Sequence, residues 1–272
     1  MRKLIDIIKD AESKKIAVAH FNVSNLEMLK AVANVARREK IPVIVAVSEG
    51  EREFIGLKQI SALIKSLREE GLEIFLNADH THSLDKAKDA VEAGFDSITF
   101  DASNLSLEEN ILKTKEVVDY IKNINPKMLI EGNLDLKDIP EANLTDPQIA
   151  SQFVNKTKVD LLGPAVGNIQ GEMGLRGEKL DIERIKEIRK LADVPLVLHG
   201  GSGIDKNQLI KAIEAGISIV HISTEVRLAW RNSLEKSLEN NPEEIAPYKI
   251  MPEVISDIET LVERKLRIFN RI

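Results

Sequence analysis

Short apolar runs rich in β-branched residues alternate with longer amphipathic segments along almost the whole chain. A run that is apolar at successive positions predicts a parallel strand buried on both faces. The segments between the runs have helical spacing at residues 25–38, 84–93, 107–124, 182–191 and 206–215. The eight runs comprise residues 16–21, 42–47, 73–78, 97–100, 128–131, 159–164, 195–198 and 218–222.

Eight strand-and-helix units in one chain predict an α/β protein, a single closed (β/α)8 TIM barrel, with an open doubly wound sheet as the alternative. No Pro- or Gly-rich linker divides the sequence, so residues 1–272 are predicted to form one domain. Two extra helices are expected. The amphipathic residues 1–10 would cover one end of the fold, and residues 254–268 would pack on the barrel or on another subunit.

Composition excludes several classes of function. The chain has no Cys, which excludes disulfides, thiolate metal ligands and Cys nucleophiles. Its formal charge of −6 argues against nucleic acid or an anionic membrane as the main partner. No stretch resembles a signal peptide or a membrane span, so the expected location is cytoplasmic. Neutral-pH proton transfer and soft metal binding are left to five histidines: His20, His80, His82, His199 and His221.

All five histidines lie at or just beyond the predicted end of a strand. In a (β/α)8 barrel the loops at the carboxyl ends of the strands build the active site. Further polar side chains share these positions, so we predict a functional cleft on this rim. Besides the residues discussed below, the predicted rim set comprises His20, His82, Asp101, Ser103, Glu131 and Asn133.

Asp79 and His80 follow the third predicted strand, and His199 follows the seventh. Imidazoles and a carboxylate around one opening suit a divalent metal such as Zn²⁺, which acts as a Lewis acid on a carbonyl oxygen. Asp79 is a candidate proton carrier. The alternative for Asp79 is that it caps the following helix, although Ser83 is better placed for capping.

Two small-residue loops predict a phosphate site. His199-Gly200-Gly201-Ser202-Gly203 and Ser223-Thr224 follow the last two predicted strands, where backbone N–H groups and hydroxyls can hold an anion. None of the eight runs contains a Lys, which argues against a Schiff-base mechanism and favours a metal for carbanion chemistry.

Several motifs together resemble one enzyme family. They are residues 19–27 (AHFNVSNLE), 45–50 (VAVSEG), 77–80 (NADH), 108–111 (EENI), 198–203 (LHGGSG) and 223–225 (STE). In collinear order they resemble the class II, metal-dependent fructose-bisphosphate and tagatose-bisphosphate aldolases.

This resemblance implies a barrel enzyme of carbohydrate metabolism and glycolysis, acting as a homodimer or homotetramer. The implied reaction is reversible cleavage of a ketose 1,6-bisphosphate, foremost fructose 1,6-bisphosphate, to dihydroxyacetone phosphate and glyceraldehyde 3-phosphate. The resemblance assigns proton exchange to Asp79 and Zn²⁺ binding to His80 and His199. It assigns contacts with the sugar or its phosphate to Asn22, Ser48, Gly171, Gly200, Ser202, Ser223 and Thr224; the glycine cradle adds Gly201.

The sequence departs from the family pattern at three positions. Gln170 stands where the family has its third zinc His, Asn133 replaces a Glu near the retained Glu131, and His221 replaces an Asn. Three interpretations stay open: His221 joins His80 and His199 as the third ligand, a weaker or different site keeps Gln170, or the barrel has no catalytic metal.

The base that would deprotonate dihydroxyacetone phosphate lies on the loop after strand five in the family, where Glu141 is the candidate. Two other functions stay open. One is a phosphosugar lyase or isomerase of shifted specificity; the other is a phosphosugar-binding barrel that has lost its chemistry. The retained Asp79 argues against the second, because phosphate binding alone does not need it.

Overall fold

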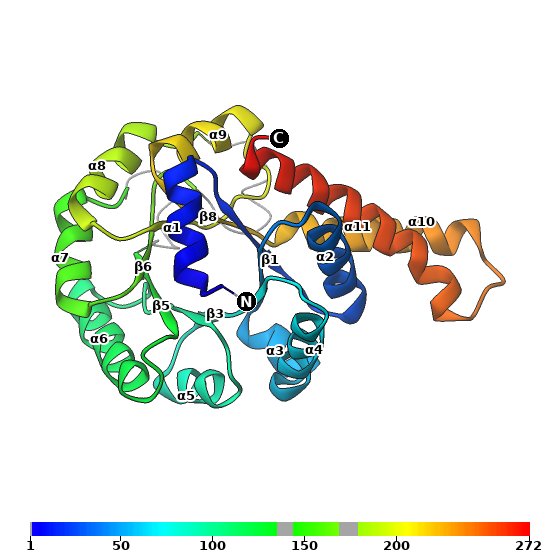
Figure 1. Cartoon of the computed structure of the whole chain (residues 1–272), viewed down its shortest axis with the longest axis horizontal. Helices are drawn as coiled ribbons and strands as arrows, with labels where there is room; N and C mark the ends of the chain where they lie inside the picture. Colours follow the sequence, from blue (N-terminus) through cyan, green and yellow to red (C-terminus); the bar gives the residue numbers. More distant parts are fainter. Residues whose placement is uncertain (1, 135–143, 169–178) are drawn as a thin grey trace.

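The computed structural model describes residues 2–134, 144–168 and 179–272. Within them, parallel strands close into a barrel in the order β1 to β8, with helices around the outside (Figure 1). The strands are β1 (Val18–Asn22), β2 (Val43–Val47), β3 (Ile74–Thr81), β4 (Ser97–Phe100), β5 (Leu129–Leu134), β6 (Leu161–Pro164), β7 (Leu196–Leu198) and β8 (Ile217–Ile222). The predicted (β/α)8 barrel is confirmed.

The helices follow the amphipathic segments of the sequence. They are α1 (Leu4–Lys14), α2 (Leu26–Glu39), α3 (Glu49–Ile55), α4 (Leu57–Glu69), α5 (Leu84–Glu92), α6 (Leu107–Ile124), α7 (Pro147–Thr157), α8 (Ile182–Ala192), α9 (Lys206–Ala215), α10 (Thr224–Asn240) and α11 (Pro247–Asn270). In the described part of the chain, no helix is both long enough and apolar enough to cross a membrane.

Helix α1 closes the amino-terminal end of the barrel, as predicted. Its buried face packs on one ring of inward-pointing side chains: Val18, Ile44, Phe75, Leu129, Leu161, Val197 and Ile219. Alternate residues of a strand face the same side, so the next inward layer lies two residues further along each strand. That layer contains His20, Asn77, Glu131, His199 and His221. Polar side chains therefore fill the barrel above a single apolar layer.

Three predicted strand ends were wrong, and all three errors concern polar residues. Strand β3 continues past the predicted end at residue 78 to Thr81, so Asp79 and His80 lie inside the strand. Strand β5 continues to Leu134, so Glu131 and Asn133 lie inside the strand, where Asn133 still pairs with Gly163 of β6. His20 lies in the middle of β1 rather than at its end. Backbone pairing with the neighbouring strand continues past the last apolar residue, which the apolar pattern does not reveal.

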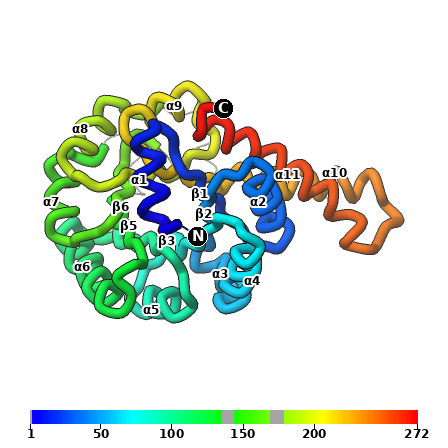
Figure 2. Tube along the Cα trace, in the orientation of Figure 1, coloured from blue at the N-terminus to red at the C-terminus, as the bar shows by residue number. Residues whose placement is uncertain are grey.

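The two last helices form a hairpin that projects beyond the barrel (Figures 1 and 2). Helix α11 packs on α10 and on α2. Arg38 of α2 binds Glu259 and Glu263 of α11, with N–O distances of 3.2 and 2.7 Å. The predicted carboxyl-terminal helix is confirmed and is longer than its apolar core of residues 254–268.

Candidate active site

Four of the five histidines meet inside the mouth of the barrel. The rings of His20 and His221 stack with their centroids 3.4 Å apart, and His199 lies 4.4 Å from His221. The ring of His80 meets His199 edge-on at 5.2 Å. His82 lies further out, with its Nδ1 2.8 Å from the carbonyl oxygen of Asp101. The barrel thus gathers His20, His80, His199 and His221 and leaves His82 at the rim.

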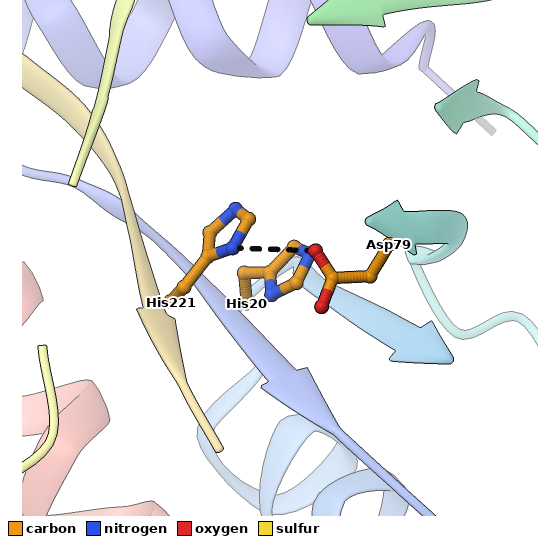
Figure 3. Close-up of side chains that lie close together, drawn as sticks. All are labelled: His20, Asp79 and His221. Atoms are coloured by element: carbon orange, nitrogen blue, oxygen red, sulfur yellow. Dashed lines mark ion pairs between the residues drawn. The ribbon is translucent and has the colours of Figure 1, made fainter. Parts of the chain in front are cut away.

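Two carboxylates face this group from opposite sides of His221. Oε1 of Glu131 lies 2.5 Å from Nε2 of His199, and Oε2 of Glu131 lies 3.9 Å from Nε2 of His221. On the other side, Oδ1 of Asp79 lies 3.7 Å from Nδ1 of His221 (Figure 3). Each nitrogen of His221 therefore faces a different carboxylate.

Asp79 is a buried carboxylate, and only one of its two oxygens accepts a hydrogen bond. Its Oδ2 accepts a hydrogen bond of 2.9 Å from Nδ2 of Asn22, while Oδ1 has no hydrogen-bond partner in the described structure. Burial alone would raise the pKa of Asp79, but the neighbouring imidazoles, His80 foremost, have the larger combined effect and lower the pKa to about 2. The alternative that Asp79 caps α5 is wrong, because the Ser83 side chain accepts the hydrogen bond from the Lys86 N–H.

A bulge in β3 turns His80 toward the site. The register with β4 shifts between Ala78 and Thr81, and His80 has a φ of 42° in the left-handed region. Arg52 stabilises this backbone, since its buried guanidinium donates to the carbonyl oxygen of Asp79 and to Oγ1 of Thr81 at 3.1 and 2.9 Å. The bulge explains how the consecutive residues Asp79 and His80 both reach the same site.

His80 is oriented as metal-binding histidines usually are. Its Nδ1 lies 2.7 Å from Oδ2 of Asp101, and Oδ1 of Asp101 accepts from the N–H and hydroxyl of Ser103. A proton on Nδ1 leaves the lone pair on Nε2, the atom that would bind a metal. Asp101 and Ser103 therefore act behind the site rather than in it.

The buried donors fit a divalent metal. Ligand atoms of Glu131, His199 and His221 lie within 4.8 Å of one another, and so do those of His20, Asp79 and His221. Buried imidazole and carboxylate donors, some without partners, match the ligand types of zinc sites. Of the predicted set, the fold brings His199 and His221 together with His80 beside them, and it adds Glu131.

The two predicted phosphate loops lie against each other at the start of α10. The N–H of Glu225 donates to Oγ of Ser202, and Oε1 of Glu225 accepts from the Gly203 N–H at 2.8 Å. Gly201 approaches β8 so closely that a Cβ there would lie 2.6 Å from Cγ1 of Val220, so only glycine fits. Ser223 precedes α10 and Thr224 begins it, so hydroxyls gather at a helix amino terminus.

A comparison with known protein families shows which family the chain belongs to. The family model of "Fructose-bisphosphate aldolase class-II" matches residues 2–272. The chain belongs to the class II fructose-bisphosphate aldolase family. It is a lyase of this metal-dependent family.

Similar proteins and solved structures agree with this family. The chain is 34% identical to a fructose-bisphosphate aldolase of Geobacillus stearothermophilus, over 97% of this chain and 95% of the relative. It is 32% identical to a 6-phospho-5-dehydro-2-deoxy-D-gluconate aldolase of Bacillus licheniformis, over 97% and 93% of the two chains. The crystal structure of the YdjI aldolase of Escherichia coli K12 matches with a TM-score of 0.86 and 30% identity, covering 99% of this chain and 97% of that one.

The sugar-contacting candidates of this aldolase share one carboxylate that the sequence interpretation missed. Oε2 of Glu51 accepts from Nδ2 of Asn22 at 3.0 Å and from the N–H of Ser48 at 2.7 Å. The spacing Ser48-Glu49-Gly50-Glu51 is a capping-box pattern, so the signal was present in the sequence. Glu51 therefore ties Asn22 to the start of α3.

Some of the site residues predicted from the sequence lie in the described part of the structure, and others do not. Glu141, Gln170 and Gly171 lie outside the described residues. Asn133 is fully buried in β5, where its carbonyl oxygen accepts from Nδ2 of Asn110. Asn77 was missed, although its inward position within a buried strand is a readable signal.

Proposed function

We propose that the chain catalyses the reversible cleavage of a ketose 1,6-bisphosphate, with fructose 1,6-bisphosphate as the first substrate to test. The products would be dihydroxyacetone phosphate and glyceraldehyde 3-phosphate. One observation carries the proposal: a buried group of imidazoles and carboxylates lies in the barrel mouth beside the β7 and β8 loops suited to a phosphate. The 34% identity to the Geobacillus aldolase supports the same substrate.

We propose Zn²⁺ as the cofactor, held by His80, His199 and His221 with Glu131 beside them. In this arrangement His221 is the third imidazole ligand. The alternative ligand, Gln170, would have to bind through its amide, and amide ligands are rare in zinc sites. A divalent ion there supplies a Lewis acid for the substrate carbonyl.

The remaining roles fall to protein groups. As the C3–C4 bond of the sugar breaks, Oδ1 of Asp79 takes the proton of the C4 hydroxyl, while Asn22 holds Oδ2 in place. Ser48 lies beside Asn22 and is proposed to contact the sugar, and Glu141 is the proposed base for dihydroxyacetone phosphate in the condensation direction. The proposed phosphate contacts are Gly171, Gly200, Gly201, Ser202, Ser223 and Thr224.

A second substrate has support of its own. The Bacillus licheniformis relative, at 32% identity, is named 6-phospho-5-dehydro-2-deoxy-D-gluconate aldolase. That compound is a sugar acid, but like fructose 1,6-bisphosphate it carries a ketone and a phosphate and is suited to aldol cleavage. His221, where the family has Asn, lies next to Asp79 and changes the surroundings of the reacting carbon.

The test is cleavage of both substrates by the full chain, before and after treatment with a chelator and after addition of Zn²⁺. We expect cleavage of fructose 1,6-bisphosphate that chelation abolishes and Zn²⁺ restores. Faster cleavage of the gluconate derivative would assign the second substrate instead. Chelator-insensitive cleavage would refute the metal mechanism, and tight phosphate binding without any cleavage would favour a binding protein.

The His221→Asn variant tests the ligand set, because it restores the residue typical of the family. We expect the zinc content per chain to fall in this variant. An unchanged zinc content would refute His221 as a ligand.

We further propose that residues 1–272 act as one unit, that the enzyme is a cytoplasmic homodimer or homotetramer, and that it serves glycolysis. The hairpin of α10 and α11 supports assembly, because Ile245 and Tyr248 at its tip are 91% and 76% exposed. Sedimentation equilibrium of the wild type and of Ile245→Asp checks this; a monomeric wild type would refute it.

A further inference from the structure

The ring of His221 is not fixed by any hydrogen bond in the described structure. Its nitrogens lie 3.7 and 3.9 Å from the nearest oxygens of Asp79 and Glu131, beyond hydrogen-bond distance. Metal-binding histidines are usually oriented by a hydrogen bond from the second ring nitrogen, as Asp101 orients His80. His221 uses both edges of its ring toward the site, so its orientation must come from its face.

The closest ring on such a face is that of His20; the ring of His199 also stacks on His221, but less closely, with centroids 4.4 Å apart and an interplanar angle of 20°. His20 and His221 are direct partners in the parallel pairing of β1 with β8, so both side chains enter the barrel at the same level. Their rings are parallel within 1° and their centroids lie 3.4 Å apart (Figure 3). His20 is 1% exposed, so its buried ring packs against His221 and has little room to move.

The ring of His20 is held from behind by groups outside the site. Its Nε2 lies 3.3 Å from Oδ1 of Asn77. The amide of Asn77 is oriented in turn, because its Nδ2 donates to Oγ of Ser97 in β4 at 2.9 Å. The hydroxyl of Thr99 lies 3.4 Å from Oδ1 of Asn77 and 3.1 Å from Oε2 of Glu131. A chain of polar contacts through β3 and β4 thus fixes the plane on which His221 rests.

His20 is also close enough to Asp79 and His221 to be considered as a metal ligand itself. The stack argues against it. The lone pair of an imidazole nitrogen lies in the ring plane, and the planes of His20 and His221, parallel within 1° and 3.4 Å apart, do not converge on one ion unless a ring leaves the stack. The ring of His199 also stacks on His221, but it is tilted by 20° at 4.4 Å, and its ligand atom lies within 4.8 Å of those of Glu131 and His221. The observed geometry of His20 suits a support better than a ligand.

We infer that His20 is a positioning residue, whose ring holds His221 in the orientation that binds the metal and replaces the usual hydrogen bond behind a ligating histidine. This inference rests on the proposed role of His221 as a ligand. The flat ring of His20 provides the contact with His221, and the contact of its Nε2 with Asn77 aligns that ring.

The test compares His20→Ala with His20→Phe in the full chain. Both variants remove the contact with Asn77, but Phe keeps an aromatic face against His221. The measurement is the Zn²⁺ dissociation constant, from competition with a chromophoric chelator. We expect about a 10- to 100-fold weaker affinity in His20→Ala, the range for lost support of a metal ligand. His20→Phe should recover part of that loss, because it keeps the ring face but not the contact that aligns it. His82→Ala, at the rim, is the control and should bind Zn²⁺ as the wild type does.

A second readout is the visible absorption of the Co²⁺-substituted protein, which reports ligand geometry independently of turnover. We expect His20→Ala to change this spectrum and His20→Phe to resemble the wild type. Unchanged affinity in His20→Ala would overturn the inference. Equal losses in Ala and Phe would overturn it too, because they would make a nitrogen of His20 the essential group.

These outcomes are separable from the test of the proposed function. If the wild type cleaves neither sugar but the Ala and Phe variants differ in Zn²⁺ affinity as expected, the role of His20 stands and the aldolase proposal fails. If cleavage depends on metal while His20→Ala binds Zn²⁺ normally, the reverse holds. Circular dichroism confirms that each variant is folded before its affinity is compared.

Discussion

Substitution of Gly163 can displace a proposed metal ligand and the carboxylate beside it without changing either residue. It lies in β6, facing the contact between Glu131 and His199. A Cβ at this position would lie 2.9 Å from Oε1 of Glu131 and 3.0 Å from Nε2 of His199. The φ of Gly163 is not positive, so alanine suits the backbone and the only consequence of Gly163→Ala is the added methyl group.

The size of the disturbance follows from these distances. Ordinary van der Waals contact to a Cβ begins at 3.4 Å, so Oε1 must move by 3.4 − 2.9 = 0.5 Å and Nε2 by 3.4 − 3.0 = 0.4 Å. The two side chains are in contact at 2.5 Å and each is 2% exposed, so neither has free space to move into. Overpacking of this kind costs about 1–3 kcal/mol of folding stability.

Metal binding should suffer more than stability, because Nε2 of His199 is a proposed ligand atom and Oε1 of Glu131 lies in contact with it. We expect the Zn²⁺ affinity of Gly163→Ala to fall by about 10- to 100-fold, the scale for a mispositioned ligand shell. The assay is chelator competition, with urea denaturation to measure stability. Full recovery of cleavage at saturating Zn²⁺ is not expected, since the displaced side chains stay displaced.

Gly50→Ala is the matched control. Gly50 lies in α3 and a Cβ there would meet nothing within 4 Å. We expect unchanged Zn²⁺ affinity and a gain of roughly 0.4–1 kcal/mol in stability, since alanine restricts the unfolded chain. If Gly163→Ala binds Zn²⁺ as tightly as Gly50→Ala, the Glu131–His199 contact is not part of the metal site and the reasoning is refuted.

Three further changes test contacts around the site. In Lys265→Met, the buried partner of Glu225 (2.7 Å) is lost, and urea denaturation should show about 3 kcal/mol less stability. Burial lowers the pKa of Lys265 in the folded chain below the ordinary 10.5, although Glu225 opposes this. Between the folded pKa and 10.5 the unfolded chain binds more protons, so the stability of the wild type should rise with pH in this range, and Lys265→Met should lack that rise. Ser83→Ala should cost about 1 kcal/mol by loss of the α5 cap; an unchanged midpoint would contradict the cap. Asp101→Asn should weaken Zn²⁺ binding by about 10- to 100-fold, because the carboxylate behind His80 is lost; equal affinity would exclude that support.

The barrel and its phosphate loops could be predicted because their signals are local. A buried parallel strand reads as a continuous apolar run, and the glycines and hydroxyls after β7 and β8 follow their strands directly. The residues at which the strands end were harder to predict. Glu131 interrupts an apolar run, so the pattern stops there, while the backbone continues to pair with β6 as far as Leu134.

The backbone at His80 could not be predicted from pattern alone. Asp79 and His80 are consecutive, so an unbroken strand would place them on opposite faces. The sequence suggested that both belong to one site, and the bulge between Ala78 and Thr81 resolves the conflict. Its support by Arg52 depends on a contact between α3 and β3, which only the assembled fold provides.

The meeting of His20 and His221 depends on the closure of the barrel. Their positions within β1 and β8 predict that both face inward, because each lies two residues after an apolar residue that packs on α1. Which inward residue of β1 stands beside which of β8 depends on the register at the closing pair of strands, and a shift of two residues would put Val18 or Asn22 there instead. With the observed register, His221 gains the parallel ring of His20 at 3.4 Å, in addition to the ring of His199 at 4.4 Å and a carboxylate facing each nitrogen. The proposed role of His221 as a metal ligand in place of Gln170 therefore depends on this register, because a His at the same level of β8 without His20 beside it would lack the support that we propose for its ring.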